Sequence, residues 1–434
     1  MTGSSRHYVL AAGGTGGHLL PAFALASELD QRGHHVALIT DERGEAIPGR
    51  PDFLTTHVLP AGRIGGKNPL KWLGGLKAIW QGRQMALRLF DSFQPSAVVG
   101  FGGYPAFPAL AASTSAKIPS IVHEQNAVLG RVNRLLAGRV QAIATAYPDI
   151  ERLKPKHASK VELVGNPVRA PVLALRDEDF PPLGEDGLFR VLVTGGSQGA
   201  SILSDVVPDG LSMLPPALRQ RLQVTQQCRK ADLDAVRERY RNHGIPAELG
   251  TYFEDMHHRL ADTHLFIGRA GASTIAELTA VGRPAILIPL PIATDDHQAA
   301  NTREMVEAGG ARMIRQPIAT TKTPQGDSDA ANRLRVEQSD MAQKLSKDIS
   351  RQIKALADRP DGLARAAHAA WNCGRPDAVK DLADLVESFG GADMMDVIRV
   401  GGGEGRLKVQ SVPRGQGASR GRFPRAQASR NRAA

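Results

Sequence analysis

The sequence predicts an α/β protein of two Rossmann-like, doubly wound domains that face each other across a cleft. The chain of 434 residues is long for a single hydrophobic core and suits two domains. Short apolar runs alternate with helical patterns in the first half, and the same alternation restarts near residue 190. Three of the apolar runs end in glycine-rich turns, GGTGGH at 13–18, GFGGYP at 100–105 and GGSQGA at 195–200.

Strands and helices alternate along the first half of the chain. The pattern predicts strands at residues 8–12, 35–39, 97–99 and 120–123, and helices near residues 20–32 and 106–115. This order is typical of a parallel sheet that is covered by helices on both faces. Ligands of such sheets gather beyond the carboxyl ends of the strands, which is where the glycine-rich turns begin.

The second half repeats this organisation after a proline-rich link. Residues 164–186 hold four prolines and are predicted to connect the two domains. Further strands are predicted at residues 190–194, 223–226, 265–267 and 285–289. We therefore expect an amino-terminal domain over residues 1–165, a second domain over residues 166–392 and a basic tail over residues 393–434.

The composition is that of a globular protein in a reducing compartment. Hydrophobic residues make up 42% of the chain, and Cys228 and Cys373 are expected to be free thiols without metal-ligand spacing.

Residues 92–116 carry no charge, but their glycines and prolines fit a strand, a turn and a helix better than a membrane span. The apolar run at 8–12 is too short for a signal-peptide core, and the polar segment 320–332 is expected to be a solvated insertion loop without a metal site.

Most of the net positive charge lies at the carboxyl end. Residues 397–434 contain nine basic residues and one acidic residue, a net charge of +8, whereas the whole chain carries +10. This glycine-rich segment is expected to be disordered. Its charge would suit anionic lipid or nucleic acid, but an extension without function is the favoured interpretation, and we expect no specific nucleic-acid partner.

A second basic segment lies between Asp52 and Asp91, where acidic residues are absent and basic residues alternate with Trp and Leu. Five of its residues recur at helical spacing and predict an amphipathic helix, namely Leu76, Trp80, Arg83, Leu87 and Phe90. The apolar stripe of this helix either packs on the core or docks on anionic lipid. Residues 63–90 are therefore the candidate membrane patch.

The glycine-rich turns carry the candidate chemistry. Such a turn before a helix lets backbone N–H groups approach an anion at the positive end of the helix dipole. The first turn does not match the dinucleotide fingerprint G-x-G-x-x-G, because His18 directly follows Gly16 and Gly17. In the first turn of a helix, the dipole lowers the pKa of an imidazole and favours its neutral, proton-accepting form. His18 is therefore either a catalytic base or a locally packed histidine.

Seven motifs occur in the order found in one enzyme family. They are GGTGGH at 13–18, GGYPAFP at 102–108, HEQN at 123–126, GNPVR at 165–169, GGSQGA at 195–200, RAGASTIAE at 269–277 and DDHQAAN at 295–301. Together, over roughly residues 6–390, they resemble the MurG family of peptidoglycan N-acetylglucosaminyltransferases. The resemblance implies a GT-B fold and an inverting, metal-independent transfer of N-acetylglucosamine from UDP-GlcNAc, without a cofactor.

The acceptor and the location are implied by the same resemblance. The acceptor would be undecaprenyl-diphosphate-linked N-acetylmuramoyl-pentapeptide, called lipid I, and the product would be lipid II. The protein would be peripheral, on the cytoplasmic side of the cell inner membrane. Residues 63–90 would supply the contact with that membrane.

The resemblance also implies roles for individual residues. The donor would be bound by Thr15, Gly16, Gly17, Asn126, Arg169, Ser197, Phe253, Ala272, Ser273, Thr274, Glu277 and Gln298. The acceptor diphosphate would be held by Gly13, Gly14, Gly102, Gly103 and Tyr104. His18 is the candidate catalytic base, and Glu124 is the alternative. Without the family, the segment 123–126 would equally be a polar strand end.

Some of these roles have an alternative in the residues themselves. Arg169 would pair with the donor diphosphate or form an interdomain salt bridge. Glu277 is expected at the ribose hydroxyls, but its spacing from Thr274 also matches a capping box. Gln298 is preferred to His297 as the sugar contact, because a planar amide both donates and accepts hydrogen bonds.

The expected mechanism is a single in-line displacement. The 4-hydroxyl of the muramoyl sugar would attack the anomeric carbon of the donor as UDP leaves, with Arg169 and helix amino termini stabilising the departing charge. The alternatives are another sugar-nucleotide enzyme of the same fold, such as a lipid glycosyltransferase or a UDP-GlcNAc 2-epimerase, and a nonenzymatic nucleotide-sugar-binding module. Transfer to lipid I distinguishes among them.

Overall fold

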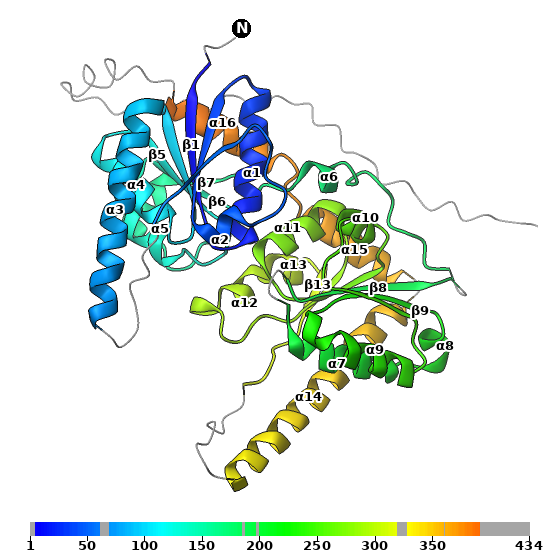
Figure 1. The fold of residues 1–434 in the computed structure, drawn as a ribbon. Helices are drawn as coiled ribbons and strands as arrows, with labels where there is room; N and C mark the ends of the chain where they lie inside the picture. The colour runs from blue at the N-terminus through cyan, green and yellow to red at the C-terminus, as the bar shows by residue number, and fades with distance from the viewer. Residues whose placement is uncertain are drawn as a thin grey trace, which may run out of the picture.

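Two parallel sheets, each covered by helices on both faces, form the two halves of the molecule (Figure 1). The computed structural model describes residues 5–60, 69–184, 187–196, 199–318, 328–359 and 361–390, without the side chains of 69–73, 328–332 and 390. The predicted class, an α/β protein of two doubly wound domains, is confirmed. The predicted tail, 393–434, lies outside the described residues.

The first sheet has seven strands in the order β3-β2-β1-β4-β5-β6-β7, and all of its pairs are parallel. The strands are β1 (His7–Ala12), β2 (His35–Thr40), β3 (Thr55–Val58), β4 (Ala97–Gly102), β5 (Ser120–Glu124), β6 (Ala142–Thr145) and β7 (Val161–Leu163). From β1 the chain adds β2 and β3 on one side, and then β4 to β7 on the other side. The topological switch point of the sheet therefore lies between β1 and β4. The first two glycine-rich turns follow these adjacent strands and therefore lie at the same sheet edge.

Helices cover both faces of the first sheet. They are α1 (Gly16–Gln31), α2 (Glu42–Glu45), α3 (Pro69–Phe93), α4 (Ala106–Ser115) and α5 (Arg131–Leu136), with a 3-10 helix at Pro155–Lys160. Alternate residues of β1 face opposite sides, so that Leu10 packs on α1 while Val9 and Ala11 pack under α3, α4 and α5. The continuous apolar run of β1 follows from burial on both faces.

The second sheet has six strands in the order β10-β9-β8-β11-β12-β13, again parallel throughout. The strands are β8 (Phe189–Thr194), β9 (Leu222–Gln227), β10 (Ala247–Gly250), β11 (Leu265–Gly268), β12 (Ala285–Leu287) and β13 (Ala311–Met313). The third glycine-rich turn follows β8 at the centre of this sheet, so the two domains present their glycine-rich turns in the same topological position.

The helices of the second half are arranged in the same way. They are α6 (Ala170–Leu173), α7 (Ser201–Ser212), α8 (Pro216–Arg219), α9 (Leu233–Asn242), α10 (Met256–Ala261), α11 (Ala272–Val281), α12 (His297–Asn301), α13 (Arg303–Glu307), α14 (Ser328–Ala357), α15 (Gly362–Asn372) and α16 (Ala378–Gly390), with 3-10 helices at Lys230–Asp232 and Thr294–Asp296. Helices α7, α9 and α14 pack on one face of the second sheet, whereas α6, α10, α11 and α13 pack on the other.

Helix α16 packs on the first domain, although the predicted division assigned residues 166–392 to the second. Its Leu382, Ala383 and Val386 are fully buried among the side chains of α1 and the first sheet. The helix carries an apolar stripe that the sequence makes visible, but a stripe does not specify which domain it will cover. The chain therefore crosses between the domains twice.

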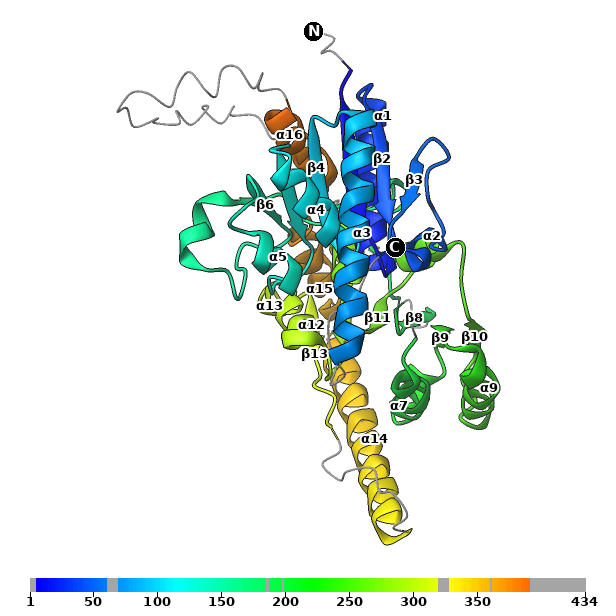
Figure 2. The same cartoon turned by 60° about the vertical axis from the view of Figure 1, so that its left-hand side comes forward.

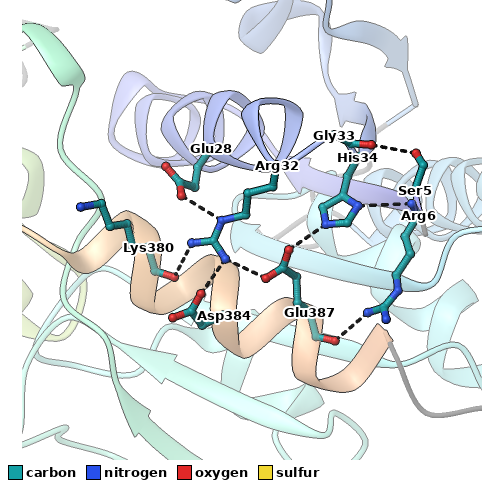
Figure 3. Close-up of polar contacts among 9 residues, drawn as sticks. All are labelled: Ser5, Arg6, Glu28, Arg32, Gly33, His34, Lys380, Asp384 and Glu387. Atoms are coloured by element: carbon teal, nitrogen blue, oxygen red, sulfur yellow. Dashed lines mark hydrogen bonds and ion pairs between the residues drawn. The ribbon is translucent and has the colours of Figure 1, made fainter. Parts of the chain in front are cut away.

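Polar contacts tie the solvent-facing side of α16 to the end of α1 (Figure 3). Nη1 of Arg32 donates to Asp384 Oδ1 at 2.5 Å and to Glu387 Oε2 at 2.7 Å. The other oxygen of Glu387 bonds to His34 Nε2 at 2.7 Å, and its backbone carbonyl accepts from Arg6 at 3.0 Å. One carboxylate on α16 thus holds two basic side chains of the first domain.

The two crossing segments touch each other at Gly165. Its φ of +92° is unfavourable for any residue with a side chain, and a Cβ there would lie 2.9 Å from the Cβ atoms of Arg375 and Ala378. Glycine therefore allows the first crossing, before Arg169, to lie directly against the second crossing, before α16. The first crossing lies within the predicted link, residues 164–186. This link contains the short helix α6.

Two predicted element boundaries are wrong. Strand β4 continues to Gly102, so Gly100 is a strand residue rather than a turn residue. A Cβ on Gly100 would stand 2.3 Å from Cδ1 of Leu110, so glycine here makes room for that side chain. Helix α14 begins at Ser328, inside the loop predicted for 320–332, whose first eight residues lie outside the described part.

Helix α3 is longer than the sheet that it covers and extends past it (Figures 1 and 2). The predicted apolar stripe divides along its length. Phe90, near the carboxyl end, is buried in the core, whereas Leu76 and Trp80 are 53% and 61% exposed. The core interpretation therefore holds for one end of the stripe only. Residues 63–68 of the candidate patch lie outside the described residues.

Candidate active site

His18 lies in the first turn of α1, directly after the first glycine-rich turn. Its Nδ1 is 3.0 Å from the carbonyl oxygen of Gly13. Because a carbonyl only accepts, Nδ1 carries the proton, and Nε2 of the neutral ring keeps a lone pair. Burial lowers the pKa of His18 below the usual 6.5, and the charges of Glu124 and Asp41 oppose this shift. The ring is therefore neutral and proton-accepting at pH 7.

The second glycine-rich turn lies against the first. A Cβ on Gly102 would stand 3.1 Å from Nε2 of His18, and a Cβ on Gly103 would stand 2.5 Å from the carbonyl oxygen of Gly13. Both residues have φ values that favour glycine, +98° and +81°. Glycine at 102 therefore avoids a side chain that would crowd the accepting nitrogen of His18. Tyr104 follows in this turn and is partly exposed.

The first turn bonds to an acidic residue after β2, Asp41, that the sequence analysis missed. The N–H of Gly14 donates to Asp41 Oδ1 at 3.0 Å, and the same oxygen accepts from Gly44 at 2.9 Å. This N–H is therefore occupied, which argues against the predicted contact of Gly14 with the acceptor diphosphate. Arg43 lies beside this carboxylate, 3.6 Å from Oδ2, and its side chain is 70% exposed.

Glu124 accepts four hydrogen bonds in a buried position at the end of β5. Oε1 accepts from the backbone and side-chain nitrogens of Asn126 at 3.1 and 3.2 Å. Oε2 accepts from Gly130 N at 2.7 Å and Asn133 Nδ2 at 2.9 Å. A carboxylate whose two oxygens are both engaged in this way organises the loop. This setting argues against Glu124 as the alternative base.

His123 of the HEQN segment fastens the first domain to the link. Nε2 of His123 lies 2.9 Å from the carbonyl oxygen of Gly165, and Nδ1 faces the amide of Gln125 at 3.1 Å. Burial lowers the pKa of His123 to about 4, so the ring stays neutral at physiological pH. His123 thus holds the first crossing at the end of β5.

Arg169 and Glu277, both predicted donor contacts, pair with each other. Nη2 and Nε of Arg169 donate to Glu277 Oε1 at 2.7 and 3.0 Å, so the pair joins the link to α11 of the second domain and is not the interdomain salt bridge that the sequence left open. The capping-box alternative for Glu277 is wrong, because α11 begins at Ala272 with Gly271 as its N-cap. Thr274 is therefore a helical residue, and Glu277 lies one turn further along.

The amino terminus of α11 has the features of an anion site. Gly271 supplies no side-chain cap to the first N–H groups of the helix. The buried hydroxyl oxygen of Ser273 has no hydrogen-bond partner within the described part of the chain. With Ala272 and Thr274, this turn presents the backbone and hydroxyl donors that a phosphate requires. Helix α11 also touches α1, so the two helices meet across the domain interface.

Helix α12 carries Gln298 and His297 at its amino end. The carbonyl oxygen of the Gln298 side chain accepts from Leu290 N at 2.9 Å, which fixes the direction of the amide. His297 of the same helix also lowers the pKa of His18, so α12 faces the first glycine-rich turn from the second domain. Asn301, at the end of α12, bonds directly to Asn126 of the first domain at 3.0 Å.

The predicted uridine contact Phe253 follows β10, and among the described residues it shares no hydrogen bond or ring contact with the site residues above. Its ring packs over Gly250, where a Cβ would stand 2.8 Å away, and under the guanidinium of Arg259 at 4.3 Å. Ser197 of the third glycine-rich turn lies outside the described residues. The flanking Gly196 and Gly199 have φ values of +77° and +69°, as a tight turn before α7 requires.

A small cavity of about 30 Å³ lies between the domains behind α11. It is lined in part by Asn166, Val168, Ala276, Glu304 and Arg375. Ligand pockets usually measure roughly 300–1,000 Å³, so this cavity has room for water and not for a nucleotide sugar. Across the described ranges, no group of three or more His, Cys, Asp or Glu side chains could hold a metal ion.

Comparison with known proteins connects these features to one family. Residues 8–145 match the glycosyltransferase family 28 N-terminal domain, and residues 190–360 match the glycosyltransferase family 28 C-terminal domain. A curated relative from Erythrobacter litoralis is 73% identical over 97% of this chain and 100% of its own length. Another, from Novosphingobium aromaticivorans, is 70% identical over 92% of this chain and 96% of its own.

Both relatives are named UDP-N-acetylglucosamine–N-acetylmuramyl-(pentapeptide) pyrophosphoryl-undecaprenol N-acetylglucosamine transferase. Among solved structures, MurG from Acinetobacter baumannii has a TM-score of 0.65 at 26% identity and covers 88% of this chain and 99% of its own. A UDP-GlcNAc 2-epimerase from Neisseria meningitidis has a TM-score of 0.58 at 15% identity, covering 88% and 100%, and shares the fold alone. The chain belongs to glycosyltransferase family 28, within the MurG family of N-acetylglucosamine transferases.

Proposed function

We propose that this protein transfers N-acetylglucosamine from UDP-GlcNAc to the 4-hydroxyl of lipid I, with inversion at the anomeric carbon, to give lipid II. The observation that carries this proposal is the full-length match to transferases of that name, at 73% identity over 97% of the chain. The enzyme is a UDP-GlcNAc-dependent glycosyltransferase.

His18 is the proposed base. Its Nδ1 proton is held by Gly13, so Nε2 accepts the proton of the attacking 4-hydroxyl while UDP leaves from the opposite side of the sugar. A lowered pKa keeps Nε2 unprotonated at pH 7. Gly102 leaves space at this nitrogen for the acceptor sugar.

The donor is proposed to bind at the amino terminus of α11 and the surrounding residues. Arg169 would turn to the diphosphate and Glu277 to the ribose hydroxyls, so that donor binding exchanges their mutual ion pair for two ligand contacts. The open donors of the α11 turn support a phosphate position there. Asn126 and Gln298 would contact the transferred sugar, and Thr15, Gly16 and Gly17 would face it from α1.

The acceptor diphosphate is proposed to lie at Gly13, Gly102, Gly103 and Tyr104. The protein would then work as a peripheral protein on the cytoplasmic side of the inner membrane. In the described part of the chain, no helix is both long and apolar enough to span a bilayer. The exposed Leu76 and Trp80 of α3, with nearby basic residues such as Lys77, support a surface contact with anionic lipid.

The reaction is tested with purified protein, UDP-GlcNAc and a water-soluble lipid I analogue, by measuring UDP release and product mass. UDP release should require the analogue and should be absent with an analogue that lacks the 4-hydroxyl. The new glycosidic bond should be β by NMR coupling, because the donor is an α-linked sugar. Epimerised UDP-GlcNAc, or donor binding without any transfer, would contradict the proposal.

A further inference from the structure

Most contacts of the α12 region with the first domain fall on residues 124–134, which run from the end of β5 through a loop into α5. Oδ1 of Asn301 accepts from the backbone N–H of Ala127 at 2.8 Å, and Nδ2 donates to Asn126 Oδ1 at 3.0 Å. Asp295, just before α12, bonds to Arg134 at 3.0 Å. These contacts join the helix that carries Gln298 to the loop that carries Asn126.

The side chain of Asn301 is fully buried, and its polar atoms are all engaged. Besides the two contacts with the first domain, Nδ2 lies 3.3 Å from the carbonyl oxygen of Ala270, in the turn before α11. Asn301 therefore joins three segments of the proposed donor site. Among uncharged side chains, only an amide can accept one hydrogen bond and donate two others from one planar group.

These contacts also fix the orientation of Asn126. Glu124 Oε1 is an acceptor, so the nitrogen of the Asn126 amide must face it, at 3.2 Å. The oxygen of that amide then faces Nδ2 of Asn301. A planar amide held at both ends cannot rotate, and each of its polar atoms retains capacity for one further hydrogen bond.

We propose that Asn301 is a positioning residue that orients Asn126 toward the transferred sugar when the two domains meet. This inference rests on the proposed function, in which Asn126 contacts the sugar of UDP-GlcNAc. Asn301 itself lies outside hydrogen-bond contact with the substrates and acts through Asn126. Recognition of the sugar is thereby coupled to the docking of α12 on the first domain.

The test compares Asn301→Asp, Asn126→Ala and the double variant. Asn301→Asp preserves size and the acceptor for Ala127, but it sets a carboxylate oxygen against Asn126 Oδ1. We expect kcat to fall roughly 10- to 100-fold, the loss typical of one buried hydrogen bond that becomes unfavourable. Affinity for UDP-GlcNAc should fall in calorimetry, whereas affinity for UDP, which lacks the sugar, should stay within about threefold.

The double variant distinguishes positioning from general structure. If Asn301 acts through Asn126, then adding Asn301→Asp to Asn126→Ala should change kcat by less than about threefold. Full additivity of the two losses would overturn the inference. Asn301→Ala is a second variant for the same comparison of kcat values. If its melting temperature is lower than that of the unmodified protein, only the isosteric Asn301→Asp is used.

Arg303→Ala is the matched control. Arg303 lies on α13, directly after α12, and touches none of the proposed substrate contacts. Its replacement removes an exposed interdomain ion pair with Glu151, at 2.6 Å. Its kcat and affinities should remain unchanged, because exposed ion pairs contribute little. An equal loss in Arg303→Ala would show that any weakened docking suffices, against a specific role for Asn301. Absence of transfer by the unmodified protein, with the affinity pattern intact, would instead overturn only the proposed reaction.

Discussion

His18 shows how one backbone contact decides the chemistry of a side chain. The carbonyl of Gly13 fixes the tautomer, so the accepting nitrogen is the one that a side chain at Gly102 would crowd. A glycine-rich sequence followed by histidine predicted the place of this ring but not its tautomer. The same holds for Glu124, whose four donors come from residues two to nine positions later in the chain.

At the residue scale, the pH dependence of catalysis follows from the lowered pKa of His18. A base must be neutral, so kcat/KM should be constant around pH 7 and should fall only as the pH drops below the usual histidine value of 6.5. His18→Ala should lose roughly 10²–10⁴-fold in kcat, retain UDP-GlcNAc binding and lose this acidic limb. An acidic limb above pH 7, or one that persists unchanged in His18→Ala, would remove His18 from the role of base.

At the scale of elements, α12 and α16 both pack on the first domain, and their sequences do not predict these contacts. Helix α12 has five residues, yet it carries Gln298 and Asn301 and docks on the first domain. Helix α16 is the last described helix, and its buried side chains complete the core of the first domain. Both helices join segments that are more than 150 residues apart in the sequence.

The burial of α16 predicts a stability effect in the first domain. Leu382→Ala removes a fully buried side chain from the contact with α1 and should lower the free energy of unfolding of this domain by about 2–5 kcal/mol. Urea titration followed by circular dichroism measures the change. Ser388→Ala, at an exposed position of the same helix, should leave the midpoint unchanged. Equal midpoints for the two variants would contradict the docking of α16.

At the scale of the whole molecule, two crossings and the α12 contacts hold the domains together. The crossings touch at Gly165, and the pair Arg375 and Glu304, at 2.8 Å, fastens the second crossing to α13. On the first domain, α3 extends beyond the sheet (Figure 2). Its Leu76 and Trp80 are exposed. This end of α3 would contact the membrane that holds the acceptor.

Binding to vesicles tests this orientation of the molecule. Replacing Leu76 and Trp80 together by serine should lower affinity for phosphatidylglycerol-containing vesicles roughly tenfold or more, because both side chains lose apolar burial at the interface. Sedimentation with vesicles measures it, and binding should weaken as salt rises. Met213→Ser, an exposed apolar position on the second domain, is the control. Undiminished binding of the double variant would exclude α3 as the contact.

The sequence by itself determined the two-domain α/β class, most strand positions and the three glycine-rich turns. These features follow from local rules, since apolar runs, glycine spacing and helix periodicity are properties of neighbouring residues. The candidate site residues follow the carboxyl ends of strands and are named by the family motifs, and their roles as substrate contacts stay predictions.

The tertiary structure alone decided which side chains face one another. It packed α16 on the first domain, paired Arg169 with Glu277, saturated Glu124 and set Asn301 against Asn126. An apolar stripe indicates that a helix packs on something, and a polar side chain indicates that it needs a hydrogen-bond partner. Neither indicates which distant segment supplies the contact. That choice depends on how the sheets and crossings place residues far apart in the chain, which is why the positioning contacts emerge only from the folded molecule.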